Sequence, residues 1–221
     1  ASKEQVLVTE LSSFQLMGID SFTPQISLLL NITEAHLDYH TDIDEYRQAK
    51  LNLIANQTAD QFCVYNAEDE VIVNGLSRTK ATCVPFSLTS VVDGAYLSEG
   101  DVYFKDEKII DIESILLKGD HNLQDVLGAV AVSKLYGCDT EAIKRVLKRF
   151  VGVKHRLQYV DEVNGVKYYN NSKATNVIAT QTALKAFEDS IILLAGGLDR
   201  QHDLSGLLPY FSKIKAIVTF G

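Results

Sequence analysis

Short apolar runs alternate with helix-like stretches through the first part of the chain. Four of these runs have the length of strands: residues 5–8, 26–30, 61–65 and 81–86. Between the second and third runs, a polar stretch around residues 43–56 predicts a helix whose inward residues are Tyr46, Leu53 and Ile54. Continuous apolar runs are typical of parallel strands covered on both faces. The pattern therefore predicts an α/β core around a parallel sheet.

The pattern changes after residue 94. Short alternating segments separated by polar turns predict an antiparallel meander over residues 95–97, 102–104 and 109–112. Residues 122–136 then predict a helix that ends at Gly137, and its apolar side chains share one face: Leu123, Val126, Leu127 and Val130. A second helix is predicted from Asp139 or Thr140, with the same spacing of apolar residues: Ile143, Val146, Leu147 and Phe150.

A domain boundary is predicted after these helices, giving domains over residues 1–152 and 153–221. In the second domain, Asn164-Gly165 is a strong hairpin signal between strands over 157–163 and 166–169. A helix to about Phe187, a buried strand over 190–195, a further helix after Asp203 and a last strand over 216–221 follow. This alternation predicts a second parallel α/β domain. Because the chain starts and stops inside apolar runs, we expect it to be a fragment.

Composition narrows the class of protein. The chain has 221 residues, 46% hydrophobic and 23% charged, with a net charge of −8. Such an acidic globular chain is not expected to have nucleic acid or an anionic membrane as its main partner. Cys63, Cys83 and Cys138 fit neither a zinc site nor a disulfide framework, which favours a reducing cytoplasm. No apolar run reaches the roughly 20 residues that span a bilayer, and no signal peptide opens the chain.

The first candidate site combines Glu10, His36 and Lys50. Glu10 and His36 each follow a predicted strand, and parallel strands bring such residues to one edge of a sheet, where ligands bind. Glu10 suits Mg²⁺, which prefers oxygen ligands, whereas His36 is a less usual ligand. A free Lys50 would repel the metal, but a carbamate formed with CO₂ would offer two anionic oxygens. Taken alone, each of these residues is more often a solvated loop or helix residue than a ligand.

Three further polar clusters precede or follow predicted elements. Asn122, with Asp125 one turn later, either caps a helix or contacts the edge of a base. Arg156 in His155-Arg156 is either a solvated charge or a bidentate phosphate ligand at the domain boundary. The run Asn170-Asn-Ser-Lys-Ala-Thr-Asn176 before a helix suits an anionic ligand. Gly196-Gly197 with Asp199 and Arg200 is a weak signal by itself.

Taken in order, these motifs resemble the Mur ligase family. The matching segments are Glu10–Leu16, Asn31–Asp38, Tyr46–Lys50, His121-Asn122, His155-Arg156, Ser172–Asn176 and Gly196-Gly197. The Ser-Lys-Ala-Thr-Asn run points to the branch that adds D-glutamate to UDP-N-acetylmuramoyl-L-alanine in peptidoglycan synthesis. The resemblance implies most of a P-loop-type central ATPase domain with a small antiparallel meander, followed by an incomplete Rossmann-like domain. It also implies a cytoplasmic monomer with small-molecule substrates.

The resemblance assigns roles to single residues. Glu10, His36 and carbamylated Lys50 match catalytic residues that hold two Mg²⁺ ions, and Ser12 and Gln15 match residues close to the nucleotide-sugar. Around ATP, Asn122 and Asp125 match positions near the adenine, Arg156 matches a residue that reaches the phosphates, and Asn171 matches a position near the ribose. The positions expected around D-glutamate are Lys173, Thr175 and Arg200. The family reaction that follows is ATP-dependent amide formation through an acyl phosphate.

Two kinds of departure from the family stand out. Members usually carry asparagine at position 125 and aspartate at position 171, whereas this chain has Asp125 and Asn171. We expect this exchange to weaken ATP binding more than it alters the chemistry. The family's phosphate loop, G-x-x-G-K-[ST], does not occur here, and we expect it upstream of residue 1 together with the uridine-binding domain.

Other functions remain open at this point. Another ATP-dependent amide ligase of the same fold, a sister Mur ligase or a folylpolyglutamate synthase, fits most of the motifs but not the Ser-Lys-Ala-Thr-Asn run. A catalytically dead homologue that holds a nucleotide-sugar would not need Glu10, His36 and Lys50. A dehydrogenase is a weaker alternative, because no G-x-G-x-x-G follows any predicted strand.

Overall fold

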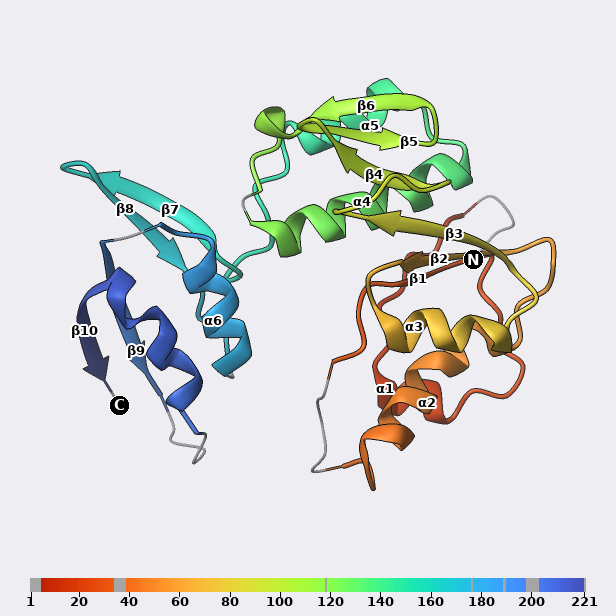
Figure 1. Ribbon diagram of the computed structural model, residues 1–221, viewed down its shortest axis with the longest axis horizontal. Helices are drawn as coiled ribbons and strands as arrows, with labels where there is room; N and C mark the ends of the chain where they lie inside the picture. Colours follow the sequence, from red (N-terminus) through yellow and green to blue (C-terminus); the bar gives the residue numbers. More distant parts are fainter. Residues whose placement is uncertain are drawn as a thin grey trace. The chain divides into compact units, whose positions relative to one another are not determined.

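The computed structural model describes residues 5–33, 39–117, 119–175, 177–188, 190–197 and 203–220. The chain divides into two compact units (Figure 1). Unit 1 comprises Ala1–Ile112 and Gln124–Lys144, and unit 2 comprises Glu113–Leu123 and Arg145–Gly221. We describe each unit by itself. Among the described residues, no helix has the combined length and apolar character needed to cross a membrane.

Unit 1 is built on a six-stranded mixed sheet with the order β1-β2-β3-β4-β5-β6. The strands are β1 (Ile26–Leu29), β2 (Phe62–Asn66), β3 (Thr82–Ser87), β4 (Ala95–Ser98), β5 (Asp101–Phe104) and β6 (Glu107–Asp111). The first four pair in parallel, and β4, β5 and β6 pair antiparallel. The predicted parallel core and antiparallel meander are therefore confirmed, and they form one continuous sheet.

Helices cover both faces of this sheet because β1 is apolar on both sides. The helices of unit 1 include α1 (Ser13–Met17), α2 (Ile43–Ala55), α3 (Glu70–Gly75) and, from Gln124 onward, α4 (Asp120–Tyr136), together with the short 3-10 turn η1 (Leu76–Arg78). The 3-10 turn η2 (Ile112–Ser114) lies where the chain passes into unit 2. Leu29 belongs to a buried cluster with residues of α2 and α3. Leu28, its neighbour, faces α4 instead, where a Cβ on Gly128 would lie only 3.0 Å from a Leu28 methyl group. Glycine at this position lets the helix lie close to the strand.

Two predictions about the apolar pattern are wrong. Residues 5–8 form no strand, and Val6, Leu7 and Val8 are 57%, 81% and 92% exposed. A segment is a β-strand only when it forms backbone hydrogen bonds with a neighbouring strand. β1 is an edge strand of the described sheet, and residues 5–8 pair with none of the described strands. In α5 (Thr140–Leu147), Ile143 and Leu147 are buried, but Val146 is 62% exposed. The helix also ends before Phe150, which is therefore not part of its face.

Unit 2 contains the predicted hairpin and a parallel strand pair. The elements are β7 (Gln158–Val163), β8 (Val166–Asn170), α6 (Val177–Lys185), β9 (Ile191–Gly196), η3 (Ser205–Lys213) and β10 (Ile214–Phe220). Asn164 and Gly165 both have positive φ, 53° and 79°, as the tight turn between antiparallel strands requires. The segment predicted as a further helix is 3-10 helix η3, with Pro209 inside it. β9 and β10 pair in parallel, as predicted.

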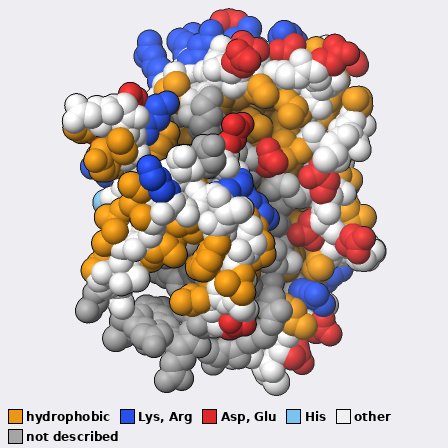
Figure 2. Space-filling view, turned by 60° about the vertical axis from the view of Figure 1, so that its left-hand side comes forward, with side chains coloured by type: hydrophobic (Ala, Val, Ile, Leu, Met, Phe, Trp, Pro, Cys, Tyr) orange, Lys and Arg blue, Asp and Glu red, His pale blue; other side chains and the backbone are white. Residues whose placement is uncertain are grey.

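Many apolar side chains of unit 2 remain exposed. The strand residues concerned include Tyr159, Val160, Tyr168, Ile192, Leu194, Val218 and Phe220. Figure 2 shows broad apolar areas on the face that it presents. Parallel strands are normally covered on both faces, so the two-stranded β9-β10 sheet is sparsely covered for its type.

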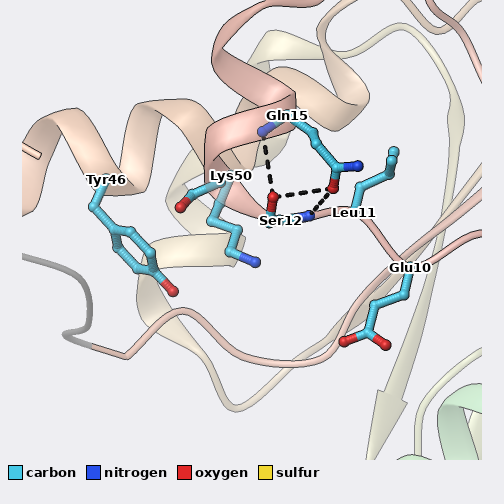
Figure 3. A pocket seen from close by; sticks show the side chains of 7 residues that line it. Glu10, Leu11, Ser12, Gln15, Tyr46 and Lys50 are labelled. Carbon is cyan, nitrogen blue, oxygen red and sulfur yellow. Dashed lines mark hydrogen bonds between the residues drawn. The ribbon is translucent and has the colours of Figure 1, made fainter. Parts of the chain in front are cut away.

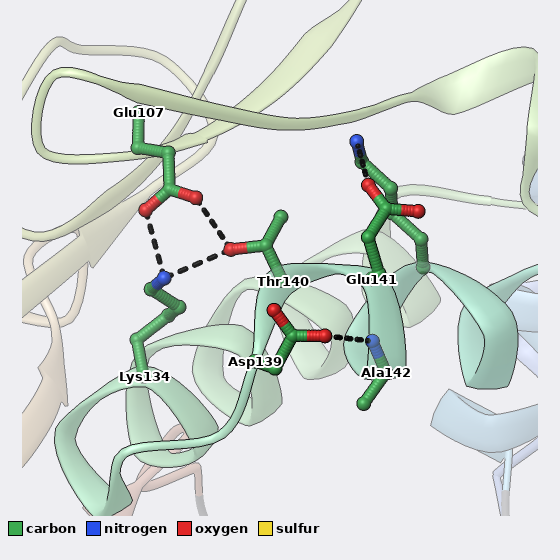
Figure 4. A network of polar contacts seen from close by, with 7 residues as sticks. Glu107, Lys134, Asp139, Thr140, Glu141 and Ala142 are labelled. Atoms are coloured by element: carbon green, nitrogen blue, oxygen red, sulfur yellow. Dashed lines mark hydrogen bonds and ion pairs between the residues drawn. The ribbon is translucent and has the colours of Figure 1, made fainter.

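A polar network ties the meander to the helices that follow it (Figure 4). Lys134 on α4 donates to Glu107 at the start of β6, with Nζ 2.7 Å from Oε2. The Thr140 hydroxyl at the start of α5 donates to the other Glu107 oxygen, and Lys134 Nζ lies 2.9 Å from that hydroxyl. The hydrogen bonds from Lys134 and then Thr140 hold the pKa of Glu107 below its ordinary value.

The Glu107 network predicts a pH-dependent effect on stability. A carboxyl group with a lowered pKa stabilises the fold when ionised, and this contribution is lost as the pH falls through the lowered value. Glu107→Gln should therefore lower the free energy of unfolding by less than about 1 kcal/mol at pH 7, because the pair is largely solvated. The difference from the unsubstituted protein should shrink below about pH 4. Denaturant unfolding at several pH values measures it.

The control for this prediction is Glu188→Gln, which removes the same charge from an exposed position in unit 2. It should change stability little at any pH. A Glu107→Gln effect that stays constant down to pH 3, or that grows as the pH falls, would contradict the role given to this carboxylate.

Candidate functional site

The residues predicted from the beginning of the chain meet at one pocket in unit 1. A pocket of about 370 Å³ is lined by Glu10, Leu11, Ser12, Ser13, Gln15, Tyr46 and Lys50 (Figure 3). The first five come from α1 and the loop before it, and the last two come from α2. The structure thus brings together Glu10, Ser12, Gln15 and Lys50. Glu10 arrives there from an irregular segment, not from the end of a strand.

A capping box shapes the α1 side of the pocket. Ser12 is the N-cap residue, and its hydroxyl accepts a hydrogen bond from Gln15 N at 3.3 Å. Gln15 Oε1 in turn accepts from Ser12 N at 2.9 Å and from the Ser12 hydroxyl at 3.0 Å. This reciprocal pair satisfies backbone donors of the first turn. The oxygen of Gln15 is therefore engaged within α1, and its amide nitrogen is the group left for a ligand.

The buried imidazole of His40 joins α1 to the start of α2. Its Nε2 lies 2.9 Å from the Ser13 hydroxyl, and its ring stacks on Phe14 with centroids 5.6 Å apart. The edge of Tyr46 meets the same ring at 5.3 Å. At the other end of α1, Asn52 donates its side-chain amide to Leu16 O at 3.2 Å. These contacts fix the two sides of the pocket relative to each other.

Lys50 is half-buried at the base of this pocket. Burial lowers the pKa of its ammonium, and attraction by Glu10 acts in the opposite direction. Within the described ranges, no carboxylate lies within ion-pairing distance of its Nζ. In Figure 3 the amine points into the space between the Tyr46 hydroxyl and the Glu10 carboxylate. A lowered pKa increases the neutral, nucleophilic fraction of a lysine amine at neutral pH.

Tyr46 and Ser13 are pocket residues that the sequence interpretation did not identify as such. Tyr46 was assigned to the core only, and at 6% exposure it is buried, which raises the pKa of its hydroxyl. It also lines the pocket one helical turn from Lys50. The i, i+4 spacing of these two residues was the available signal. Ser13 lies next to the predicted Ser12 and had no signal of its own.

Side chains at the end of β2 and just after it hold the segment that follows β1. Asn66 donates its amide to Leu30 O at 3.0 Å, and Asp69 accepts from Ile32 N at 2.8 Å. These bonds continue the contact between β1 and β2 beyond the last paired residues. The predicted ligand His36 lies outside the described residues.

The described carboxylates and imidazoles do not form a complete metal site by themselves. In the described part of the chain, no group of three His, Cys, Asp or Glu side chains is arranged to hold an ion. Glu10 offers two oxygens at the pocket. That donor set suits Mg²⁺, which commonly takes one or two carboxylates together with water and substrate phosphates.

Asn122 and Asp125 share the first turns of α4. The helix begins at Asp120, so Asn122 is its third residue and the N-cap alternative is wrong. Gln124, between the two, donates to Glu68 at 3.4 Å. Glu68 also accepts from the backbone of Leu88 at 2.8 Å and Thr89 at 2.9 Å, which anchors the loop after β3 beside α4.

In unit 2, the segment around Arg156 contacts the loop that follows β8. Asn171 Oδ1 accepts from Leu157 N at 3.0 Å, and Lys173 N donates to His155 O at 3.1 Å. Arg156, Lys173 and Thr175 are exposed. The structure thus joins the backbone segments that carry Arg156, Asn171 and Lys173. Arg200 lies outside the described residues.

This chain is similar in sequence to a known family and to named ligases. Residues 1–133 match the family model of the Mur ligase middle domain. UDP-N-acetylmuramoylalanine–D-glutamate ligase of Geobacillus sp. (strain WCH70) is 54% identical, covering 97% of this chain and 48% of the relative. The ligase of the same name from Bacillus cereus (strain G9842) is 51% identical, covering 100% and 49%. The chain thus spans about half the length of the curated relatives it matches.

A solved structure supports the fold independently of close sequence identity. The MurF ligase of Thermotoga maritima, crystallised in complex with ADP, superposes with a TM-score of 0.63 at 17% identity. The match covers 90% of this chain and 49% of that chain. At this identity the likeness concerns the fold, a mixed α/β arrangement with a mostly parallel sheet.

The pocket electrostatics predict how Lys50 responds to its neighbour. Glu10→Gln removes the attraction that favours the ammonium, so the pKa of Lys50 should fall further below its ordinary value. Titration of the Lys50 ε-carbon signal by NMR measures this. Glu107→Gln, whose carboxylate pairs with Lys134 instead, is the control and should leave Lys50 unchanged. A Lys50 pKa that rises or stays constant in Glu10→Gln would contradict the pocket geometry.

Proposed function

Because this chain belongs to the Mur ligase family, we propose that the intact protein is an ATP-dependent ligase that joins D-glutamate to UDP-N-acetylmuramoyl-L-alanine. The observation that carries the proposal is the 51–54% identity to ligases of that name, which extends over all or nearly all of this chain. The Glu10–Lys50 pocket supports it, because it lies within the matched middle domain. The product is a precursor of peptidoglycan, made in the cytoplasm.

The proposed reaction has two steps, phosphorylation of the substrate carboxylate and attack of the amine on the acyl phosphate. The substrate carboxylate attacks the γ-phosphorus of ATP, the bond to the bridging oxygen breaks, and an acyl phosphate and ADP result. The amine of D-glutamate then attacks the acyl carbon and loses a proton, a carbon–nitrogen bond forms, and inorganic phosphate leaves. Both steps gather negative charge in a small volume. The site therefore needs fixed positive charge and exclusion of water.

Lys50 is proposed to act as a carbamate. Its neutral amine attacks CO₂, and loss of a proton leaves an N-carboxylate at the base of the pocket. The lowered pKa of Lys50 supports this, because only the neutral amine reacts. Glu10 and the carbamate, with His36, would then hold Mg²⁺, which when bound neutralises charge on the transferring phosphoryl group. Ser12 and Gln15 orient the nucleotide-sugar through the groups that the capping box leaves available.

The remaining residues of the predicted site are assigned either to ATP or to D-glutamate. We assign Asn122 and Asp125 to the adenine, Arg156 to the phosphates, and Asn171 to the nucleotide side of the site. Lys173, Thr175 and Arg200 surround the D-glutamate carboxylates. In this scheme residues 1–152 carry Asn122 and Asp125 for ATP, and residues 153–221 carry the residues for the amino acid together with Arg156 and Asn171. The MurF ligase of similar fold was crystallised in complex with ADP, which supports ATP as the nucleotide of this scheme.

A folylpolyglutamate synthase is the second candidate, because the fold by itself accommodates both activities. Release of phosphate from ATP by the intact protein separates the two activities. We expect release when UDP-N-acetylmuramoyl-L-alanine and D-glutamate are supplied, and none when a folate and L-glutamate are supplied. Release only with the folate would favour the alternative. Binding of the UDP-sugar and ATP without any release would favour a catalytically dead homologue.

The carbamate predicts a specific pattern of loss and rescue. Lys50→Ala should reduce kcat by about 10²–10³-fold or more, because one charge-stabilising group is removed from the site. Short carboxylates such as formate or acetate should partly restore ligation by occupying the vacated space. Lys80→Ala, at an exposed position, is the matched control and should remain active. No rescue in a folded Lys50→Ala protein would count against the carbamate.

The two departures from the family pattern predict the response of ATP affinity. The double substitution Asp125→Asn with Asn171→Asp should lower the KM for ATP by about two- to tenfold, the worth of one net hydrogen bond. The gain comes from restoring an amide donor and removing a carboxylate at position 125. Steady-state kinetics at saturating D-glutamate measure it. An unchanged KM for ATP would show that these positions do not set affinity.

A further inference from the structure

Arg156 lies between two residues with unusual backbone conformations. His155 and Leu157 have φ values of 68° and 43°, in the left-handed region that residues other than glycine rarely adopt. Such conformations persist only where surrounding contacts impose them, and they concentrate where a ligand is held.

Hydrogen bonds from the loop after β8 hold the turn on both sides of Arg156. On one side, His155 O accepts from Lys173 N at 3.1 Å. On the other side, Leu157 N donates to Asn171 Oδ1 at 3.0 Å. Of the two, only the second uses a side chain, so a substitution at position 171 can remove it without altering the backbone.

The Asn171 side chain is held by a loop that is itself folded. Asn171 O accepts from Ala174 N at 2.9 Å, which closes a turn. Asn170 Oδ1 accepts from Ser172 N at 3.0 Å, and Asn170 Nδ2 lies 3.1 Å from His155 Nδ1. The acceptor that Leu157 meets therefore sits on a fixed support. Arg156, by contrast, is exposed and forms no ion pair with a described carboxylate, so its guanidinium is available to an anion.

We propose that Asn171 is a positioning residue for Arg156: by accepting the hydrogen bond of Leu157 N, it fixes the turn that aims the guanidinium at the phosphates of ATP. This inference rests on the proposed function for the identity of the anion. It differs from a direct contact between Asn171 and the ribose, because the effect of Asn171 reaches the nucleotide through another residue. A side-chain oxygen is what the position needs, and either asparagine or aspartate supplies it.

A double-mutant cycle on the intact protein tests the route of the effect, with ATP dissociation constants measured calorimetrically. Asn171→Ala should weaken ATP binding about fivefold when Arg156 is present, in the range of one lost hydrogen bond. In the Arg156→Gln background it should weaken binding by less than about twofold, because the residue that it positions is gone. Equal weakening in both backgrounds would overturn the proposal.

A second measurement separates positioning from ribose recognition. With 2′,3′-dideoxy-ATP, which has no ribose hydroxyls, Asn171→Ala should produce the same fold-weakening as with ATP. Disappearance of the effect with this analogue would assign Asn171 to the ribose and overturn the proposal. Asn171→Asp is the matched variant that keeps the acceptor, and it should preserve the contribution of Arg156.

Hydrogen exchange without nucleotide tests the geometry independently of the reaction. The Leu157 amide should exchange about tenfold faster or more in Asn171→Ala and remain protected in Asn171→Asp. Unchanged exchange in Asn171→Ala would show that this bond does not hold the turn. Because exchange and ATP binding need no ligation, they can succeed or fail separately from phosphate release with UDP-N-acetylmuramoyl-L-alanine, which tests the proposed function.

Discussion

The packing of the short helix α1 against α2 is the contact on which the candidate site depends. α1 has only five residues, too few to be a stable helix alone, and its position comes from tertiary contacts. Within α1, the side chain of Leu16 is only 1% exposed. The buried His40 ring joins Ser13 of α1 to the start of α2. Because Glu10 and Lys50 come from the two sides of this contact, their separation and the burial of the amine both follow from it.

The two units hold a basic side chain in place through different contacts. In unit 1, a capping box and a buried imidazole hold the pocket walls, and Lys50 loses hydration without gaining a close ion pair from any carboxylate in the described part of the chain. In unit 2, side-chain and backbone acceptors hold a strained turn around Arg156. In both cases polar contacts in neighbouring segments hold a basic side chain in place before any ligand binds. A reaction that transfers a phosphoryl group benefits from groups held in place in this way.

Much of the fold could be predicted because its signals are local. A few neighbouring residues are enough to predict strands β1 and β2, the Asn164-Gly165 turn and the buried face of α4. The prediction of a strand over residues 5–8 is wrong because three consecutive apolar residues do not reveal whether a partner strand exists. Tyr46 was read as core alone, since periodicity reports burial and not what a buried side chain faces. The start of α4 was predicted two residues too late, at Asn122 instead of Asp120, so Asn122 was offered as an N-cap although it lies inside the helix.

The chemistry assigned to Lys50 is the central claim, since it turns a half-buried lysine into an anionic ligand. The most direct measurement is ¹³C NMR of the intact protein equilibrated with ¹³C-bicarbonate, compared with Lys50→Ala. The account predicts a carbamate carbonyl signal that is absent from the variant and disappears when CO₂ is removed. An active protein that gives no such signal at saturating bicarbonate, or gives it equally in Lys50→Ala, would contradict it.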